Sequence, residues 1–382
     1  MLRILLAGLW CLLSAAAVPA QDKKYYCNEC KGNGFLPCKG KDCNEKTNCG
    51  TKTPHKCDAQ YGARCCRGTK KLLCPKCKDP VVDAELTAEL SSRADWVESQ
   101  RKLDDDVNAR FSHIETEHWS FHWSVPEWKV GEVVLSRTRA GHLFAERLEK
   151  AYEMMADVFG TSTPRLTGYI VNTADEMMRC TLIKQGIGHA NMPFKIYSPA
   201  GSFTCRPMAG GNGNDFDLKD DKFFHPHVVH TGVHIITQAT YGCPRPMEFA
   251  PWIDEALSHW AEMQIVKQQT TFCMREVNNN KDRWRMADWK KEILGEVTSK
   301  KEEPFAKLIT FQDDKLQPRD KAHCWSWVDF MLHGKNREKF PLFFKTLKET
   351  NDTKKALDAA YGWSTAAFHE KWREHVIKTY AP

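Results

Sequence analysis

The chain has 382 residues, of which 42% are hydrophobic and 27% are charged, proportions that are normal for a globular protein. Its formal net charge of +6 at pH 7 comes from a basic excess spread along the chain without a polybasic block, so a nucleic-acid partner is not indicated. The length exceeds that of one typical domain, and we therefore expect two folding units.

Residues 1–20 have the pattern of a cleavable secretory signal peptide. Arg3 precedes an apolar run, Ile4–Leu13, and small residues follow as far as Ala20. The apolar run is well short of the roughly 20 residues that span a bilayer, and no later segment approaches that length. We therefore expect an exported protein, in the periplasm, in the cell envelope or outside the cell, with no transmembrane segment and a mature chain that begins near Gln21.

Residues 21–80 are predicted to form a cysteine-rich module. They hold ten of the sixteen cysteines, and a segment this short with few large aliphatic residues needs crosslinks or metals to fold. Two Cys-x-x-Cys pairs, Cys27/Cys30 and Cys74/Cys77, can present their thiolates to one tetrahedral zinc ion. Because exported thiols tend to oxidise, a disulfide framework is favoured, and zinc with disulfides is the alternative.

The sequence CNECKGNG, which begins at Cys27, resembles the repeat of the DnaJ-type cysteine-rich zinc finger, in which glycines permit the tight turn after the second cysteine. The cysteines between the two pairs follow no constant spacing, so the regular fourfold repeat of that family is missing. No nucleophile and base stand out together in this module. We therefore expect a crosslinked scaffold that binds a partner rather than a catalyst.

A long amphipathic helix is predicted in the connecting segment, residues 83–117. From Asp83 to about His113 the sequence lacks Pro and Gly. Apolar residues recur there at mostly helical spacings, at Leu86, Leu90, Val97, Leu103, Val107, Phe111 and Ile114. We expect this apolar stripe to pack on the main domain.

Residues 118–382 are predicted to form the larger domain, of the α+β class. Aromatic and β-branched runs at Trp119–Trp123 and Leu166–Val171 predict strands, and the stretch between them, Arg139–Phe159, predicts a helix. Residues 199–217 are rich in Gly, Asn and Pro and predict a loop. The remainder of the chain is helical in character, with short breaks at prolines.

The candidate chemistry concentrates in this helical part. His230 and His234 are four residues apart, which places both imidazoles on one face of a helix. Valines and isoleucines surround them, so the two histidines are expected to be buried and to need partners. Glu255, in the next predicted helix, supplies a carboxylate. Two imidazoles and a carboxylate can hold a zinc ion, so His230, His234 and Glu255 are the predicted metal ligands.

Two motifs in this region, HTGVH at residues 230–234 and WIDEALSHW at residues 252–260, resemble the gluzincin family of zinc metallopeptidases, whose HExxH helix is followed by a WxxEGxAxW helix. Residues 323–332 and 356–372 are similar to later helices of that family, so the resemblance covers roughly residues 118–380. It implies a small mixed sheet followed by a mainly helical subdomain, with zinc as the cofactor.

The sequence departs from this family at the residue that performs catalysis. In gluzincins the glutamate after the first histidine activates the metal-bound water, and Thr231 stands at that position here. A threonine hydroxyl cannot act as this base near neutral pH. Ala256 replaces a glycine of the family, and His323 replaces a tyrosine that can lie near the site. We therefore do not expect ordinary peptide hydrolysis.

Three functions remain open, and the favoured one is a pseudoenzyme that keeps zinc and binds a peptide, protein or cell-envelope ligand. In the second, a zinc-dependent hydrolase uses a substitute base, either Asp254, His259 or His227. In the third, the histidines are hydrogen-bonded core residues of a metal-free structural or interaction protein. His259 is one helical turn after Glu255 and is expected to orient a ligand or replace one. His323 is expected to pack, or to donate to an oxyanion if catalysis survives.

Overall fold

The protein is described from a computed structural model, which covers residues 29, 31, 33, 35–39, 53–63, 66–76, 80–188, 195–198, 201–208, 217–241, 250–267, 269–271, 284, 287–311 and 315–381. The predicted signal peptide and Cys27, Cys30 and Cys77 lie outside these residues. Of the two Cys-x-x-Cys pairs, Cys74 alone is described, and it is buried. The mixture of helices with small sheets agrees with the predicted α+β class.

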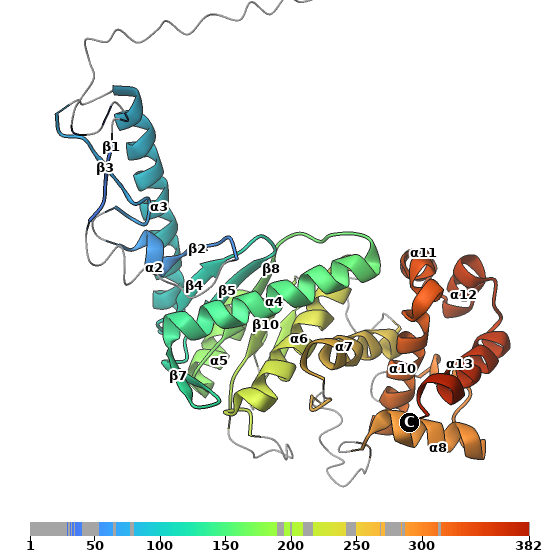
Figure 1. Cartoon of the computed structure of the whole chain (residues 1–382). Helices are drawn as coiled ribbons and strands as arrows, with labels where there is room; N and C mark the ends of the chain where they lie inside the picture. The colour runs from blue at the N-terminus through green and yellow to red at the C-terminus, as the bar shows by residue number, and fades with distance from the viewer. Residues whose placement is uncertain are drawn as a thin grey trace, which may run out of the picture.

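A mixed six-stranded sheet forms the centre of the molecule (Figure 1). Its strands lie in the order β2 (Lys56–Cys57), β4 (Ser112–Glu115), β5 (Trp119–Trp123), β8 (Leu166–Ile170), β10 (Ser202–Cys205) and β9 (Lys195–Ser198). The central strands β5, β8 and β10 are parallel, and the pairings outside them are antiparallel. The two strands predicted from sequence, β5 and β8, are confirmed and lie side by side. Two further antiparallel pairs lie outside this sheet: the hairpin of β6 (Glu127–Val130) with β7 (Val133–Ser136), and β1 (Phe35–Pro37) with β3 (Lys71–Leu73), which are distant in the sequence.

The connecting helix, α3 (Pro80–Val107), ends earlier than its apolar pattern indicates. Asn108 breaks it with a positive φ of 53°, and residues 112–115, expected in the helix, form strand β4 instead. The backbone there pairs with β5 on one side and β2 on the other, so sheet hydrogen bonds replace helical ones. The main sheet therefore begins before residue 118 and includes a strand of the cysteine-rich segment. In Figure 1, α3 extends away from the body with β1 and β3 beside it.

Helix α4 (Arg137–Phe159) packs on β4 and β5 and also on α6 (Asp221–Tyr241). Arg147 of α4 makes two hydrogen bonds of 2.6 and 2.8 Å to the Asp221 carboxylate at the start of α6. Gly232 lets the two helices approach closely, because a Cβ there would lie 2.7 Å from Leu148 Cδ2. This contact explains the glycine inside the histidine motif.

The helical half of the chain packs around α6. The helix α7 (Pro251–Val266) packs on α6 and on α10 (Pro318–Met331). The other elements of this half are α8 (Trp289–Ser299), α9 (Phe305–Leu308), η5 (Gly334–Lys339), α11 (Phe340–Thr350), α12 (Thr353–Tyr361) and α13 (Thr365–Thr379). Shorter helices elsewhere are α2 (Asp58–Tyr61), α5 (Ala174–Cys180) and the π-helical turn η2 (Thr181–Gln185). The predicted helical character of this half is confirmed in the described residues.

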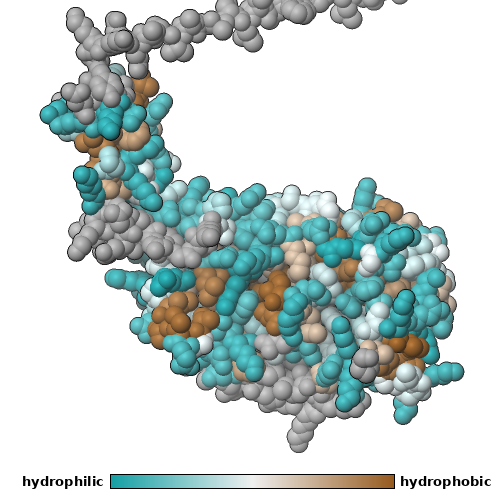
Figure 2. Space-filling view, in the orientation of Figure 1, coloured by the Kyte–Doolittle hydropathy of each residue, from teal (hydrophilic) through white to brown (hydrophobic). Residues whose placement is uncertain are grey.

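The largest side chains of the helical half form its core, and the surface is mostly polar. Fully buried tryptophans gather from four helices of this half, at Trp252, Trp289, Trp325, Trp327 and Trp372. Figure 2 shows a mainly hydrophilic face with separate apolar areas. Among the described residues, no helix has the length and apolar character needed to cross a membrane.

Candidate metal centre

The facing sides of α6 and α7 bring four ionisable side chains together in the core. His230 and His234 come from α6, and Glu255 and His259 come from α7. The side chains of His230 and His259 are 0% exposed and those of His234 and Glu255 are 1% and 4% exposed. Ligand atoms of His230, His234 and Glu255 all lie within 4.8 Å of one another, so the group can hold a metal ion.

The atoms that face each other are the imidazole Nε2 atoms and the carboxylate oxygens. His230 Nε2 and His234 Nε2 are 3.0 Å apart. Glu255 Oε2 lies 3.8 Å from His230 Nε2, and Glu255 Oε1 lies 3.8 Å from His234 Nε2. A tetrahedral zinc ion with bonds near 2.0–2.1 Å needs neighbouring donors about 3.3 Å apart, so these spacings bracket the required value.

Carboxylates on α7 hold the other nitrogen of each α6 imidazole. His230 Nδ1 is 3.3 Å from Glu262 Oε2, and His234 Nδ1 is 3.0 Å from Asp254 Oδ2. The Glu262 contact is a hydrogen bond, which keeps the proton on Nδ1 of His230 and turns its Nε2 lone pair toward the metal position, whereas the Asp254 contact of His234 lacks hydrogen-bond geometry. Glu262 is fixed in turn, because its Oε1 accepts hydrogen bonds from the backbone N–H of Thr270 at 2.6 Å and of Thr271 at 3.0 Å.

This arrangement leaves two Nε2 lone pairs pointing at each other. If His230 and His234 both carry the proton on Nδ1, the two facing Nε2 atoms repel each other at 3.0 Å. If one imidazole reverses its tautomer, a lone pair faces a carboxylate instead. A cation shared by the two Nε2 atoms removes the conflict in either case. Burial, followed by the charges of His259 and His234, holds the pKa of His230 well below its usual value, which disfavours a proton as that cation.

The carboxylate of Glu255 is ionised and partly compensated. Burial alone would raise its pKa, but the ammonium group of Lys321 and the nearby imidazoles outweigh burial and hold the pKa well below the usual range. Lys321 Nζ, on α10, is 3.2 Å from Glu255 Oε1, and the Lys321 side chain is 1% exposed. Lys195 of β9 adds a second positive charge near Glu255 and His230.

The donor set therefore fits zinc, and one observation opposes it. Nitrogen and oxygen donors of this kind are ordinary zinc ligands, and Glu255 Oε2 is buried with no hydrogen-bond partner among the described residues. Against this, Lys321 already supplies a positive charge at Glu255. The group can therefore hold a metal ion, and the Lys321 ammonium group lies where it would compete with that ion for Glu255.

Thr231, at the position where the family has its catalytic glutamate, is buried and hydrogen-bonded within α6. Thr231 is fully buried, and its Oγ1–H donates to the carbonyl oxygen of His227 at 2.8 Å. Its hydroxyl also contacts Cys205, whose thiol pKa is raised to about 12 by burial. His227 is buried one turn earlier, and burial followed by the charge of Lys195 holds its pKa well below the usual value. These contacts fix Thr231 as a packed helix residue.

The other two candidates for a substitute base, Asp254 and His259, have different partners in the structure. Asp254 faces His234 and also accepts a hydrogen bond of 3.2 Å from the Gln238 amide. His259 faces the centre, since its Nε2 is 3.9 Å from Glu255 Oε2 and its Nδ1 is 3.4 Å from Glu262 Oε2. The Nδ1 side of His259 thus shares the Glu262 carboxylate with His230, and the ligand atoms of His230, His259 and Glu262 form a second group within 4.8 Å of one another.

His323 lies outside this group. Its Nδ1–H donates to the carbonyl oxygen of Arg319 at 2.9 Å, and its Nε2 is 3.2 Å from Glu296 Oε2 on α8. Burial would raise the pKa of Glu296, but hydrogen bonds from His323 and Arg319 lower it to about 2. The residue on α10 that does reach the centre is Lys321, two positions earlier.

Sequence reasoning missed Lys321 and Glu262. Glu262 had a readable signal, because it follows His259 by three residues on the same helix and so shares its face. Lys321 had none, since only the packing of α10 on α7 brings its ammonium group to Glu255.

Three buried cysteines of this domain are thiols without a catalytic setting. Burial raises the pKa of Cys180 to about 12, and its Sγ lies 3.8 Å from Thr204 Oγ1. Burial also raises the thiol pKa of Cys324 well above its usual value.

No protein-family model matches the chain, and no curated protein matches it. The chemistry of the centre therefore follows from its own residues.

Proposed function

We propose that this is an exported, metallopeptidase-related protein whose α6–α7 centre binds zinc without ordinary peptide hydrolysis. His230, His234 and Glu255 would hold the ion, and bound zinc supplies a Lewis-acidic charge at that point. The observation that carries the proposal is the pair of imidazole Nε2 atoms 3.0 Å apart, each with a carboxylate at its Nδ1. The lack of a base at Thr231 supports the absence of normal hydrolysis.

The position of His259 supports a binding site rather than a catalytic one. Catalytic zinc sites keep a coordination position open for water or substrate, whereas structural sites are closed by four protein ligands. His259 Nε2 lies 3.9 Å from Glu255 Oε2 and so narrows the space left for water or substrate beside the three proposed ligands, while its own ligand atom groups with His230 and Glu262. Burial of the whole group supports the same conclusion. The ligand of such a protein would be a peptide, a protein or cell-envelope material.

A metal-free structural or interaction protein is the second candidate, and the buried pair of Lys321 and Glu255 favours it. An ammonium group 3.2 Å from the carboxylate supplies charge that a metal would otherwise provide. In this alternative the imidazoles are hydrogen-bonded core groups. The two candidates differ in metal content, which is directly measurable.

Elemental analysis of the purified full chain tests the proposal. We expect the His230→Ala/His234→Ala variant to hold one zinc ion per chain less than the wild type. A matched control is His333→Ala/His375→Ala, because those two imidazoles have the same ring-centroid separation of 4.7 Å but pair with no carboxylate in the described residues. Equal zinc in the wild type and the His230/His234 variant would refute the zinc centre and leave the metal-free alternative.

Placing a glutamate at position 231 tests the proposed absence of peptide hydrolysis. We expect the wild type not to cleave an unfolded protein substrate, and Thr231→Glu to gain a cleavage activity that a chelator abolishes. Thr231→Gln is the matched control, since it has the same size without a carboxylate. Chelator-sensitive cleavage by the wild type would show that a substitute base operates.

A further inference from the structure

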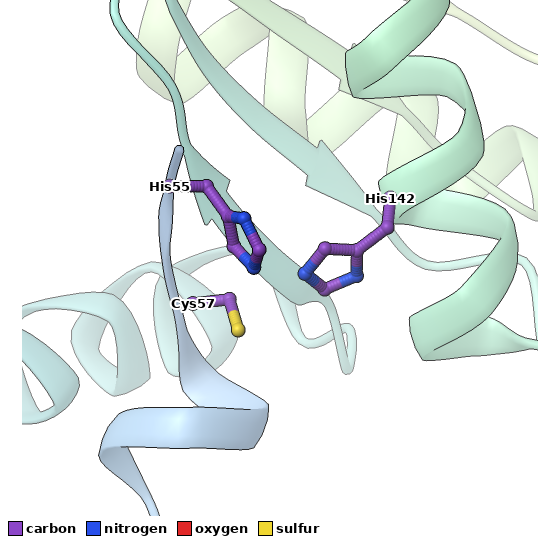
Figure 3. A group of neighbouring side chains, drawn as sticks. All are labelled: His55, Cys57 and His142. Carbon is purple, nitrogen blue, oxygen red and sulfur yellow. The ribbon is translucent and has the colours of Figure 1, made fainter. Parts of the chain in front are cut away.

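A second group of metal-ligand residues lies where the cysteine-rich segment meets the main domain. His55 and Cys57 belong to the segment that forms β2, and His142 lies in the first turns of α4. Their ligand atoms all lie within 4.8 Å of one another. Figure 3 shows the His142 ring directed toward His55 and Cys57 across the gap between β2 and α4. Nothing in the proposed zinc centre involves these residues.

Hydrogen bonds fix which nitrogen of each imidazole is available. His142 Nδ1–H donates to the carbonyl oxygen of Thr138 at 2.7 Å, and His55 Nδ1–H donates to the carbonyl oxygen of Thr53 at 2.6 Å. A carbonyl oxygen can only accept, so the proton of each neutral imidazole is on Nδ1 and the lone pair is on Nε2. Backbone carbonyls commonly hold metal-binding histidines in this orientation.

The lone pair of His142 is the unexplained feature. His142 is 1% exposed, and its Nε2 is buried with no hydrogen-bond partner among the described residues. Such an atom is costly unless something occupies its lone pair. The His55 ring lies at a centroid distance of 4.7 Å and an angle of 73°, so the rings meet edge to face instead of stacking. Gln60 Nε2 lies 3.3 Å from His55 Nε2 and is the protein donor that an ion would displace.

The local backbone places all three donors on one side. His55 and Cys57 are two residues apart in an extended segment, so their side chains share a face, and the intervening Lys56 points the other way to Glu115, at 3.0 Å. Gly141 brings α4 close to the sheet, because a Cβ there would lie 2.9 Å from Ile114 Cδ1. The glycine thus sets His142 next to the strand paired with β2.

We propose that His55, Cys57 and His142 bind a transition-metal ion of the zinc class through two imidazole Nε2 atoms and one thiolate. Two imidazoles with a thiolate suit borderline-soft and soft ions, zinc(II) first and copper(I) with similar chemistry. The ion joins the cysteine-rich segment to α4. The ion would add to the existing attachment, in which β2 pairs with β4 over two residues, Lys56 with Glu115 and Cys57 with Ile114, and Asp58 accepts hydrogen bonds from Ser112 and His113.

Cobalt(II) reconstitution of the full chain is the direct test. A thiolate bound to cobalt gives an intense charge-transfer absorption that nitrogen and oxygen donors do not give. His142→Gln removes no thiol, so a loss of part of this absorption in the variant means that a thiolate and His142 share one ion. We expect that loss together with one zinc ion fewer per chain. His118→Gln is the matched control, because His118 is an imidazole of the same domain held by Glu149.

Further measurements separate a missing site from a misfolded variant and distinguish the metals. Cys57→Ala should lose the same absorption and the same ion, and far-ultraviolet circular dichroism should match the wild type for both variants. Loading with copper(I) in place of zinc shows which ion binds more tightly. In the wild type, chelation should speed tryptic cleavage after Lys56, whereas in His142→Gln cleavage should be fast with or without metal.

Two outcomes would overturn this site. One is a zinc content and cobalt spectrum of His142→Gln identical to those of the wild type. The other is mass-spectrometric evidence that Cys57 is in a disulfide in the metal-loaded protein. Because these readouts do not depend on His230 or His234, they are independent of the zinc content of the α6–α7 centre.

Discussion

The α6–α7 centre and the β2–α4 junction use the same kinds of side chain in opposite settings. At the α6–α7 centre, neighbouring helices supply imidazoles that are surrounded by charge, with Glu255, Glu262 and Lys321 all in contact. At the junction, a strand and a helix far apart in the sequence supply two imidazoles and a thiol, and backbone carbonyls hold both imidazoles. The first site is governed by charge balance and the second by the joining of two chain segments.

This contrast predicts how each site responds to change. Substitutions around the α6–α7 centre should act on folding stability and on metal affinity together, because each leaves a buried charge or donor unmatched. Substitutions at the junction should act on metal content and on the attachment of β2, with less effect on the core. The predictions below run from the largest expected effect to the smallest.

Lys321→Met should have the largest effect on folding stability, and the size of that effect should depend on whether zinc is bound. In chelator, the variant leaves the buried Glu255 carboxylate without its ammonium partner, which costs about 3–5 kcal/mol. With zinc present, the stability should recover, and zinc should bind at least about tenfold more tightly because a competing positive charge is gone. Denaturant unfolding with and without zinc measures both. Lys348→Met is the control, since within the described part of the chain Lys348 Nζ donates only to a backbone carbonyl, that of Thr240. Unchanged stability in chelator would contradict the assigned role of Lys321.

Glu262→Gln should have an intermediate effect. The amide oxygen can still accept from the N–H groups of Thr270 and Thr271, but the amide NH2 then faces the N–H of His230 or His259. We expect a loss of about 1–3 kcal/mol in stability and an about 10- to 100-fold weaker zinc affinity. Thermal unfolding and zinc titration measure these. Glu153→Gln, at an exposed position of α4, should change neither. A variant with wild-type zinc affinity would show that Glu262 does not orient the imidazoles.

Lys56→Ala should have the smallest effect and sharpens the description of the junction. Its ion pair with Glu115 is half-exposed on the lysine side, at 51%, so we expect a loss below about 1 kcal/mol. Metal content should equal that of the wild type, because Lys56 points away from His142. Elemental analysis beside Cys57→Ala provides the comparison. Loss of metal in Lys56→Ala would mean that the register of β2 differs from the one described.

The sequence predicted best those features that follow from the periodicity of a single helix or strand. The i, i+4 spacing of His230 and His234 and the aromatic run of β5 follow from local geometry, and both appear where they were predicted. The predicted end of α3 was wrong, because Ile114 fits a helical spacing in the sequence but is held in strand β4 by its pairing with β5. Local periodicity contains no information about that pairing.

Residues that depend on packing between distant segments could not be predicted. Lys321 reaches Glu255 only because α10 lies on α7, and His142 meets Cys57 only because Gly141 lets α4 approach the sheet. His323, singled out by its place in a motif, instead pairs with Glu296. A motif thus located the helix correctly, but the direction of each side chain depended on the neighbouring helices.

The position of Lys321 late in the chain also affects the order in which the protein can be completed during its synthesis. The ribosome adds about 5–20 residues per second, so Lys321 follows Glu255 by roughly 3–13 s. During that interval a nascent chain that has already packed α6 against α7 holds a carboxylate without its ammonium partner. A bound cation would stabilise this early state, and α10 could then dock on a preformed pair of helices.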